Sequence, residues 1–309
     1  MRGGSFLKEV SPAPPFRNFS RVVRTMLADM LLPPASGLEK RTRLNGVTRR
    51  FVLRAGLFGA CACLAPWPGF AASTSYYVAN KAQFLNDFQG VCAGAEKWLA
   101  PRTSDKTAKV ITSDAKHRFE TLLPDIPDIG GTANRNQPFL TMAAWLTALT
   151  QAMAEKGLPP KDAGRLLYDL YASEWAALPK DRARAMGAAL FAPAQIAALK
   201  DWAANSQKRA NPADWVGRFV PGDGKTFDVG YDYSECGAVK YFKAHGVAAV
   251  APYFCLNDFL ASKAQGTGLI RSGTIAQGAP VCDFRYKRDR AVSQDWETEV
   301  PRFAGKQPA

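Results

Sequence analysis

The sequence lacks the short motifs that mark the commonest classes of enzyme. It has only two histidines in 309 residues, and no G-x-S-x-G, H-E-x-x-H, C-x-x-C or glycine-rich phosphate-binding motif. A Ser-His-Asp relay would have to use one of the two, His117 or His245, which lie far apart in the chain. We interpret both histidines as structural, and we expect no nucleotide-phosphate site.

A dense basic tract is also missing from most of the chain. The formal net charge is +13, but residues 1–71 hold 11 Lys/Arg against 3 Asp/Glu, while the remainder holds 29 against 24. Most of the excess positive charge therefore belongs to the first segment. Because no nucleic-acid-binding motif is present either, we expect no nucleic-acid partner. Hydrophobic residues make up 47% of the chain, enough to form a core.

The first segment has the pattern of an export signal. Thr48–Arg54 reads TRRFVLR, typical of a twin-arginine signal, and an apolar run follows from Ala55 to Ala65. This run is too short to span a bilayer comfortably. Small residues at Gly69 and Ala71 suit a signal peptidase, so the pattern predicts cleavage after Ala71.

Two regions follow from this pattern. Residues 1–71 form a leader with a twin-arginine signal peptide, and residues 72–309 form a single domain, which we expect in the periplasm after export by the twin-arginine machinery. The four cysteines of the second region are too few for a disulfide scaffold, although an oxidising compartment permits disulfides. Oligomeric state is left open.

Helical periodicity dominates the first half of this domain, and strand alternation appears in the second. The predicted helices are 80–99, 107–122, 139–156, 161–175 and 193–205, with a shorter one between the last two. The second half predicts strands at 215–220, 225–233, 268–275 and 281–287, helices at 236–244 and 247–262, and an irregular tail after Arg288. We expect an α+β fold, in which an N-terminal helical bundle-like half packs on a small antiparallel sheet with two helices.

Candidate reactive residues gather in the second half. Cys236 follows a strand and begins a helix that Ser234 is suited to cap, and a helix N-terminus lowers the pKa of a thiol. Cys255 and Asp258 are three residues apart on a predicted helix, which puts them on one face. A small buried cysteine is the alternative interpretation of Cys236.

The last two predicted strands add further candidates. Alternation places Cys282 on the core face and Asp283 and Arg285 on the other face, as a surface ion pair or as part of a site. Arg271 stands among apolar residues, and such a charge needs a carboxylate partner, either from the protein or from a substrate.

The order and spacing of these residues resemble a known family, the L-2-amino-thiazoline-4-carboxylic acid hydrolases. The resemblance spans most of Leu122 to Lys287. Its pieces are Ile129-Gly130-Gly131-x-x-Asn134, Cys236 ahead of Tyr241-Phe242 and Gly246, Pro252-x-x-Cys255-x-x-Asp258, Leu269-x-Arg271-x-x-Thr274-Ile275 with Gly278, and Cys282-Asp283-Phe284-Arg285.

The resemblance implies hydrolysis of a small cyclic amidine or amide, because the family's named reaction opens a thiazoline ring to give N-carbamoyl-cysteine. The implied catalytic residues are Cys255, Asp258, Cys236 and Cys282, and the implied substrate-binding residues are Arg271, Thr274, Asp283 and Arg285. In one route Cys255 or Cys236 attacks the amidine carbon; in the other an Asp carboxylate activates water. Asp258, with or without Asp283, would bind the amidine, and Arg271 or Arg285 the substrate carboxylate.

Two other classes of function remain open at this point. The first is a non-catalytic periplasmic small-molecule-binding protein of the same family. The second is a redox or metal-dependent thiol protein that uses Cys236, Cys255 and Cys282. We expect no cofactor or resident metal, because the spacing of these cysteines is loose for zinc, which stays the alternative.

Overall fold

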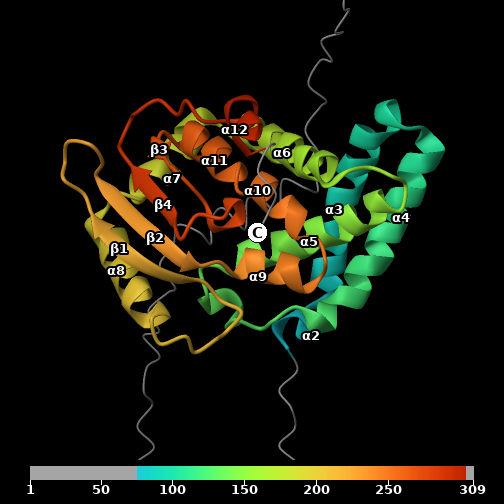
Figure 1. Ribbon diagram of the computed structural model, residues 1–309, viewed down its shortest axis with the longest axis horizontal. Coiled ribbons are helices and arrows are strands. Elements are labelled where there is room, and N and C mark those ends of the chain that lie inside the picture. Colours follow the sequence, from blue (N-terminus) through green and yellow to red (C-terminus); the bar gives the residue numbers. More distant parts are fainter. Residues whose placement is uncertain (1–74, 304–309) are drawn as a thin grey trace, which may run out of the picture.

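The computed structural model describes residues 75–303, which lie within the predicted domain. The predicted leader, with its twin-arginine motif and its cleavage site after Ala71, lies outside the described residues. Figure 1 shows a helical half beside a half that contains the sheet. The predicted α+β class is confirmed.

The helices of the first half agree closely with those predicted. They are α2 (Tyr76–Ala79), α3 (Lys81–Leu99), α4 (Asp105–Leu122), α5 (Gln137–Ala154), α6 (Pro160–Ala177), α7 (Lys180–Ala189) and α8 (Pro193–Ser206). Helix α5 is buried along almost its whole length, because its residues are apolar on every side. It packs against α4, α6 and α9 and forms the centre of the domain (Figure 1).

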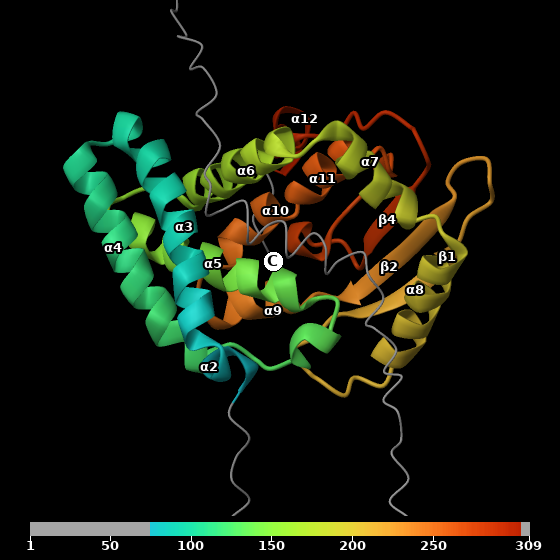
Figure 2. The ribbon, with the colours of Figure 1, turned by 180° about the vertical axis from the view of Figure 1, so that it is seen from behind.

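The sheet is antiparallel, in the order β1-β2-β4-β3. Its strands are β1 (Val216–Pro221), β2 (Val229–Glu235), β3 (Leu269–Ile270) and β4 (Cys282–Tyr286). Tyr231 and Tyr233 of β2 face the core beside Cys282 and Phe284, and Trp202 of α8 packs edge-on against the two tyrosines. Figure 2 shows α8 lying over β1 and β2.

The second half contains helices α9 (Gly237–Ala244), α10 (Ala251–Phe254), α11 (Asn257–Gln265) and α12 (Trp296–Phe303). The predicted continuous helix 247–262 is wrong, because the chain breaks between α10 and α11. There the Asn257 amide donates to the Phe254 carbonyl at 2.9 Å, so a side chain uses a helical acceptor. Cys255 therefore ends α10, while Asp258 lies in the first turn of α11.

Two strand boundaries and the tail also differ from the prediction. Residues 225–228 form a turn, because the Asp223 carboxylate accepts three of their backbone N–H groups. The predicted strand 268–275 ends at Ile270, because Asp283 holds the following residues in a bend. The tail predicted as irregular contains α12, where Trp296 stacks on Tyr253.

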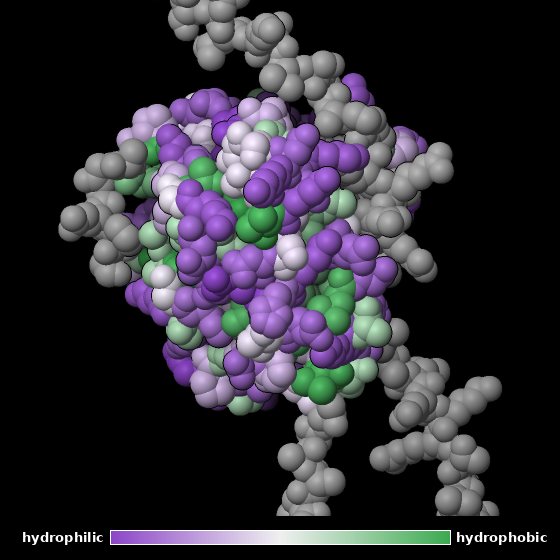
Figure 3. Space-filling model, turned by 90° about the vertical axis from the view of Figure 1, so that its right-hand side faces the viewer, coloured by the Kyte–Doolittle hydropathy of each residue, from purple (hydrophilic) through white to green (hydrophobic). Residues whose placement is uncertain are grey.

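The outer face of the helical half is mostly hydrophilic, with small separate apolar patches (Figure 3). Val110 of α4 is one of the few large apolar side chains of residues 75–303 that are exposed, at 44%. Within that range, no helix combines the length and the apolarity needed to cross a membrane.

Candidate functional site

A buried ion pair joins α11 to the bend after β3. Arg271 Nη1 lies 2.6 Å from Asp258 Oδ2, and Arg271 Nη2 donates to the Cys255 carbonyl at 2.9 Å. The Arg271 side chain is 3% exposed, whereas that of Asp258 is 29% exposed. Gln294 fixes the arginine further, because its amide bonds both the N–H and the carbonyl of Arg271. The Arg271 guanidinium therefore makes its hydrogen bonds to groups of the protein, whereas one side of the Asp258 carboxylate remains accessible.

The surroundings shift the acid–base behaviour of this pair. Burial raises the pKa of Asp258, while the Arg271 charge opposes that rise. Burial acts to lower the pKa of Arg271, but the charge and hydrogen bond of Asp258, together with the nearby Cys255 and Cys282, outweigh it, and the pKa is raised. Arg271 therefore stays charged, and Asp258 becomes a stronger base than an ordinary surface carboxylate.

The accessible side of Asp258 faces a small cavity of about 120 Å³. Its aromatic lining comprises Phe139, Tyr171, Tyr231, Tyr233, Phe254 and Tyr286. Asn257 lines it as well; this residue is 6% exposed, and its Oδ1 has no hydrogen-bond partner. A carboxylate and an unpaired carbonyl oxygen next to aromatic faces make a site suited to a flat cation that carries N–H groups.

The three predicted cysteines lie close to one another and to the Arg271–Asp258 ion pair. Cys236 is the N-cap residue of α9, Cys255 ends α10, and Cys282 begins β4. They are close enough that each influences the pKa of another. Thr274 joins the group, since its side chain lies close enough to the Cys255 thiol to lower the pKa of that thiol slightly against the effect of burial. The structure therefore brings together six of the eight residues predicted for the site, namely Cys236, Cys255, Asp258, Arg271, Thr274 and Cys282.

These thiols are not activated. Burial raises the pKa of Cys236, Cys255 and Cys282 to about 12 each. At Cys236 the backbone N–H groups at the start of α9 act in the opposite direction, as expected from its position, but burial outweighs them. Ser234 does not cap α9, because its hydroxyl donates to the Val216 carbonyl.

All four cysteines within residues 75–303 are free thiols. Over the same residues, no three or more His, Cys, Asp and Glu side chains are grouped so that they could hold a metal ion. The zinc alternative therefore has no preformed ligand set in this part of the chain.

Asp283 and Arg285 lie on the opposite face of β4 from Cys282. Asp283 accepts hydrogen bonds from the backbone N–H groups of Ser272 and Gly273 and from the Ser272 hydroxyl. Arg285 pairs with Asp232 at 2.8 Å, so the two residues do not form the surface ion pair with each other that the strand pattern allowed. Asp283 holds the bend that carries Arg271 and Thr274. The ion pair of Arg285 with Asp232 links β4 to β2.

Sequence patterns gave no signal for two residues of the cavity. Asn257 precedes the predicted Asp258 but belongs to no motif, and Arg135 lies in a loop before α5. Neither position has a periodic or spacing signature. Only the packing of α5, α11 and β2 brings them to one cavity.

The described residues form an α+β domain with a carboxylate at an aromatic cavity. Residues 138–286 match the sequence model of the family described as L-2-amino-thiazoline-4-carboxylic acid hydrolase. The resemblance predicted from the motifs is thereby confirmed over this segment, which contains all eight predicted site residues. Searches of curated proteins and of solved structures found no significant match.

Proposed function

We propose that this protein hydrolyses a small cyclic amidine in the aromatic cavity, with Asp258 as the general base. The observation that carries the proposal is the Asp258 carboxylate, held by buried Arg271 and open on its other side to the cavity. The name of the matched family supports the reaction class. L-2-amino-thiazoline-4-carboxylate is the substrate that this name suggests.

Binding of the amidine follows from the cavity lining. A protonated amidine is flat and cationic, so aromatic faces and a nearby carboxylate stabilise it. One amidine N–H would donate to the unpaired Asn257 Oδ1, which otherwise stays buried without a partner. Asp258 then lies beside the reacting carbon and is able to hold a water molecule against it.

In the proposed reaction, the water oxygen bonds to the amidine carbon while Asp258 takes one of the water protons. The carbon–sulfur bond then breaks, and Asp258 returns its proton to the leaving sulfur. The remaining hydroxyl proton leaves to solvent as the carbonyl forms. The product is N-carbamoyl-cysteine, and the net change is the addition of one water. The raised pKa of Asp258 suits both proton transfers.

The cysteine route has less support. A thiol attacks as its thiolate, and burial raises the pKa of Cys255 to about 12. In addition, Cys236, Cys255 and Cys282 are absent from the lining of the cavity that Asp258 faces. The proposal therefore uses water as the nucleophile and treats the cysteines as packing around the ion pair.

We place this activity in the periplasm, on the basis of the Arg49–Arg50 motif and the apolar run after it. The twin-arginine machinery would be the export partner. No cofactor enters the proposed reaction.

The test is turnover by the full chain. Incubation with L-2-amino-thiazoline-4-carboxylate should give a product that is one water heavier by mass spectrometry. Asp258→Asn should lose at least about a hundredfold in rate, as expected for a general base. Asp289→Asn is the matched control, because Asp289 is 79% exposed in its side chain and its φ of 59° also suits asparagine.

Two results would contradict the proposal. Full turnover by a folded Asp258→Asn variant would remove Asp258 as the base. Stoichiometric binding by the unmodified chain without any product would instead establish a non-catalytic small-molecule-binding protein.

A further inference from the structure

A second, larger cavity of about 530 Å³ lies beside the aromatic one. It lies between the loop before α5, helix α8 and the start of β1, and its surface is mainly apolar. The two cavities share two residues, Arg135 and Gln195. A bare amino-thiazoline carboxylate placed at Asp258 would leave this second space empty.

Arg135 is the charged group at the junction. Its guanidinium lies over the indole of Trp202 at 5.2 Å, and within residues 75–303 no carboxylate pairs with it. Burial raises the pKa of Tyr231 and Tyr233, and the Arg135 charge acts against that rise, so the charge lies near the aromatic cavity. A guanidinium without an anionic partner beside an apolar cavity favours a ligand that supplies a carboxylate.

Gln195 supplies a second unsatisfied group at the same place. Its Oε1 is buried and has no hydrogen-bond partner. An acceptor of this kind suits a donor N–H from a ligand. Three asparagine side chains also line the larger cavity, those of Asn134, Asn205 and Asn211. The junction is thus lined with groups that match a peptide bond and a carboxylate.

Among the charged residues that line the larger cavity, Arg135 is the one suited to bind an anion, because the others are acidic or already paired. Asp214 accepts hydrogen bonds from Asn134, Asn136 and the backbone N–H of Trp215. Arg209 pairs with Glu235 at 2.7 Å. Asp201 also lines the cavity, on an exposed position of α8.

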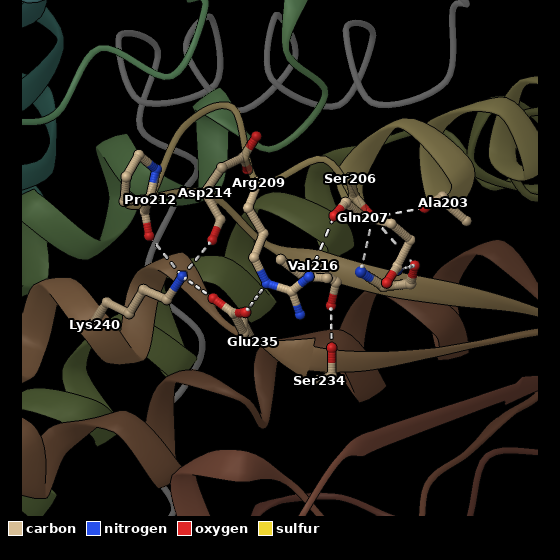
Figure 4. A network of polar contacts seen from close by, with 11 residues as sticks. Ala203, Ser206, Gln207, Arg209, Pro212, Asp214, Val216, Ser234, Glu235 and Lys240 are labelled. Atoms are coloured by element: carbon tan, nitrogen blue, oxygen red, sulfur yellow. Dashed lines mark hydrogen bonds and ion pairs between the residues drawn. The ribbon is translucent and has the colours of Figure 1, made fainter.

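The rim of this cavity is held in place before any ligand binds. Figure 4 shows Lys240 donating to the carbonyls of Pro212 and Asp214 and to Glu235, which in turn binds Arg209. A rim braced in this way costs little conformational entropy on binding.

We infer that the two cavities are subsites of one binding site for an amidine-ring carboxylate joined by an amide bond to an amino acid. The ring occupies the aromatic cavity, the amide N–H donates to Gln195, the carboxylate pairs with Arg135, and the amino-acid side chain lies over Trp202 in the larger cavity. This inference rests on the proposed function for the position of the ring. Arg135 precedes the family-matched segment 138–286 by three residues, so the match assigns it no role.

Binding of unreactive probes tests this inference apart from turnover. The probes are thiazole-4-carbonyl-phenylalanine, the same compound with glycine in place of phenylalanine, and the phenylalanine compound as its uncharged carboxamide. Their aromatic ring is not opened by water, so calorimetry on the full chain measures binding alone. We expect the phenylalanine acid to bind about tenfold more tightly than either other probe.

Two substitutions separate the subsites. Arg135→Gln should weaken both acids about tenfold and leave the carboxamide unchanged. Ala198→Leu adds bulk to the wall of the larger cavity, and it should remove the preference for phenylalanine over glycine. Arg182→Gln, on the exposed side of α7, is the matched control and should change nothing. Thermal unfolding checks that each variant is folded.

Equal affinity of the unmodified chain for all three probes would overturn the inference, as would an Arg135→Gln variant that keeps the preference for acids. If the probes bind as expected but no cyclic amidine is hydrolysed, the binding site stands and the hydrolytic proposal fails. If the amino-thiazoline is hydrolysed but the probes are not distinguished, the extended site alone fails.

Discussion

Arg271 donates to two partners on either side of a helix break, the Asp258 carboxylate in the first turn of α11 and the Cys255 carbonyl at the end of α10. One planar guanidinium therefore fixes both the break and the carboxylate. This makes Arg271 a positioning residue, since its 3% exposed side chain has no room for a substrate contact.

Replacing Arg271 should separate this positioning role from a binding role. Arg271→Lys keeps the charge but cannot reach both partners, so kcat should fall about tenfold while KM stays within about twofold. Arg271→Met leaves Asp258 without its partner, and the free energy of unfolding should fall by about 3 kcal/mol in urea titrations. Arg182→Met, on an exposed face, should change it by less than about 0.5 kcal/mol. A rise in KM alone would indicate that Arg271 contacts the substrate.

The pH dependence of the rate follows from the raised pKa of Asp258. The base must be deprotonated, so kcat falls as the pH drops through its pKa. Because burial raises that pKa, the loss should begin at a higher pH than for an ordinary aspartate. Arg271 lowers the pKa of Asp258, so Arg271→Met should move the acid limb to still higher pH. A pH–rate profile that moves to lower pH in this variant would contradict the assignment of the base.

The three thiols around the ion pair should be slow to react in the folded protein, because the pKa of each is raised. With the pKa of Cys255 raised to about 12, roughly one molecule in a hundred thousand is a thiolate at neutral pH. Iodoacetamide should therefore label Cys236, Cys255 and Cys282 within minutes only after unfolding, as read by mass spectrometry. Cys255→Ala should retain turnover, as should the control Cys92→Ala, whose thiol in α3 is buried and also has its pKa raised to about 12. Rapid labelling of Cys255 together with loss of turnover would restore the cysteine route.

Much of the fold could be predicted because its core follows simple periodicity. The helical spacing of Phe84, Phe88 and Val91 predicts α3, and alternation at Tyr231 and Tyr233 predicts β2. The errors arise where a polar side chain binds the backbone. Asp223, Asn257 and Asp283 each divert a segment that hydrophobic patterning alone reads as continuous strand or helix.

The site was predictable in part for a related reason. Arg271 could be singled out because a charge among apolar residues needs a partner, and Asp258 because of its spacing from Cys255 and the family resemblance. The two proved to be each other's partner. Arg135 and Asn257 could not, because a loop arginine or an asparagine at a helix start is ordinary on its own. Their significance depends on a cavity that three distant segments form.

We expect export to depend on the arginine pair Arg49–Arg50, which lies outside the described residues. The double variant Arg49→Lys with Arg50→Lys should leave the chain in the cytoplasm at its precursor length, because it removes the arginine pair that defines the twin-arginine signal. The matched control is Arg41→Lys with Arg43→Lys, which changes two nearby arginines and keeps the motif. Cell fractionation followed by immunoblotting distinguishes a periplasmic product shortened by 71 residues from an unexported precursor. A periplasmic product from the first double variant would exclude this route.

Asp283 could hold the bend after β3 or bind the substrate. Measurements of stability and of KM distinguish these two roles. Its carboxylate accepts the backbone N–H groups of Ser272 and Gly273 at 2.9 and 3.0 Å, and this holds the bend between Arg271 and Thr274. Asp283→Ala should therefore lower the free energy of unfolding by about 1–2 kcal/mol in urea titrations, as the loss of a helix-cap carboxylate does. Asp283→Asn keeps one acceptor oxygen and should lose about half as much. Since the same bend carries Arg271, kcat should fall in step with stability while KM changes little. A variant that keeps full stability but raises KM tenfold would instead make Asp283 a substrate-binding residue, as the sequence resemblance implied.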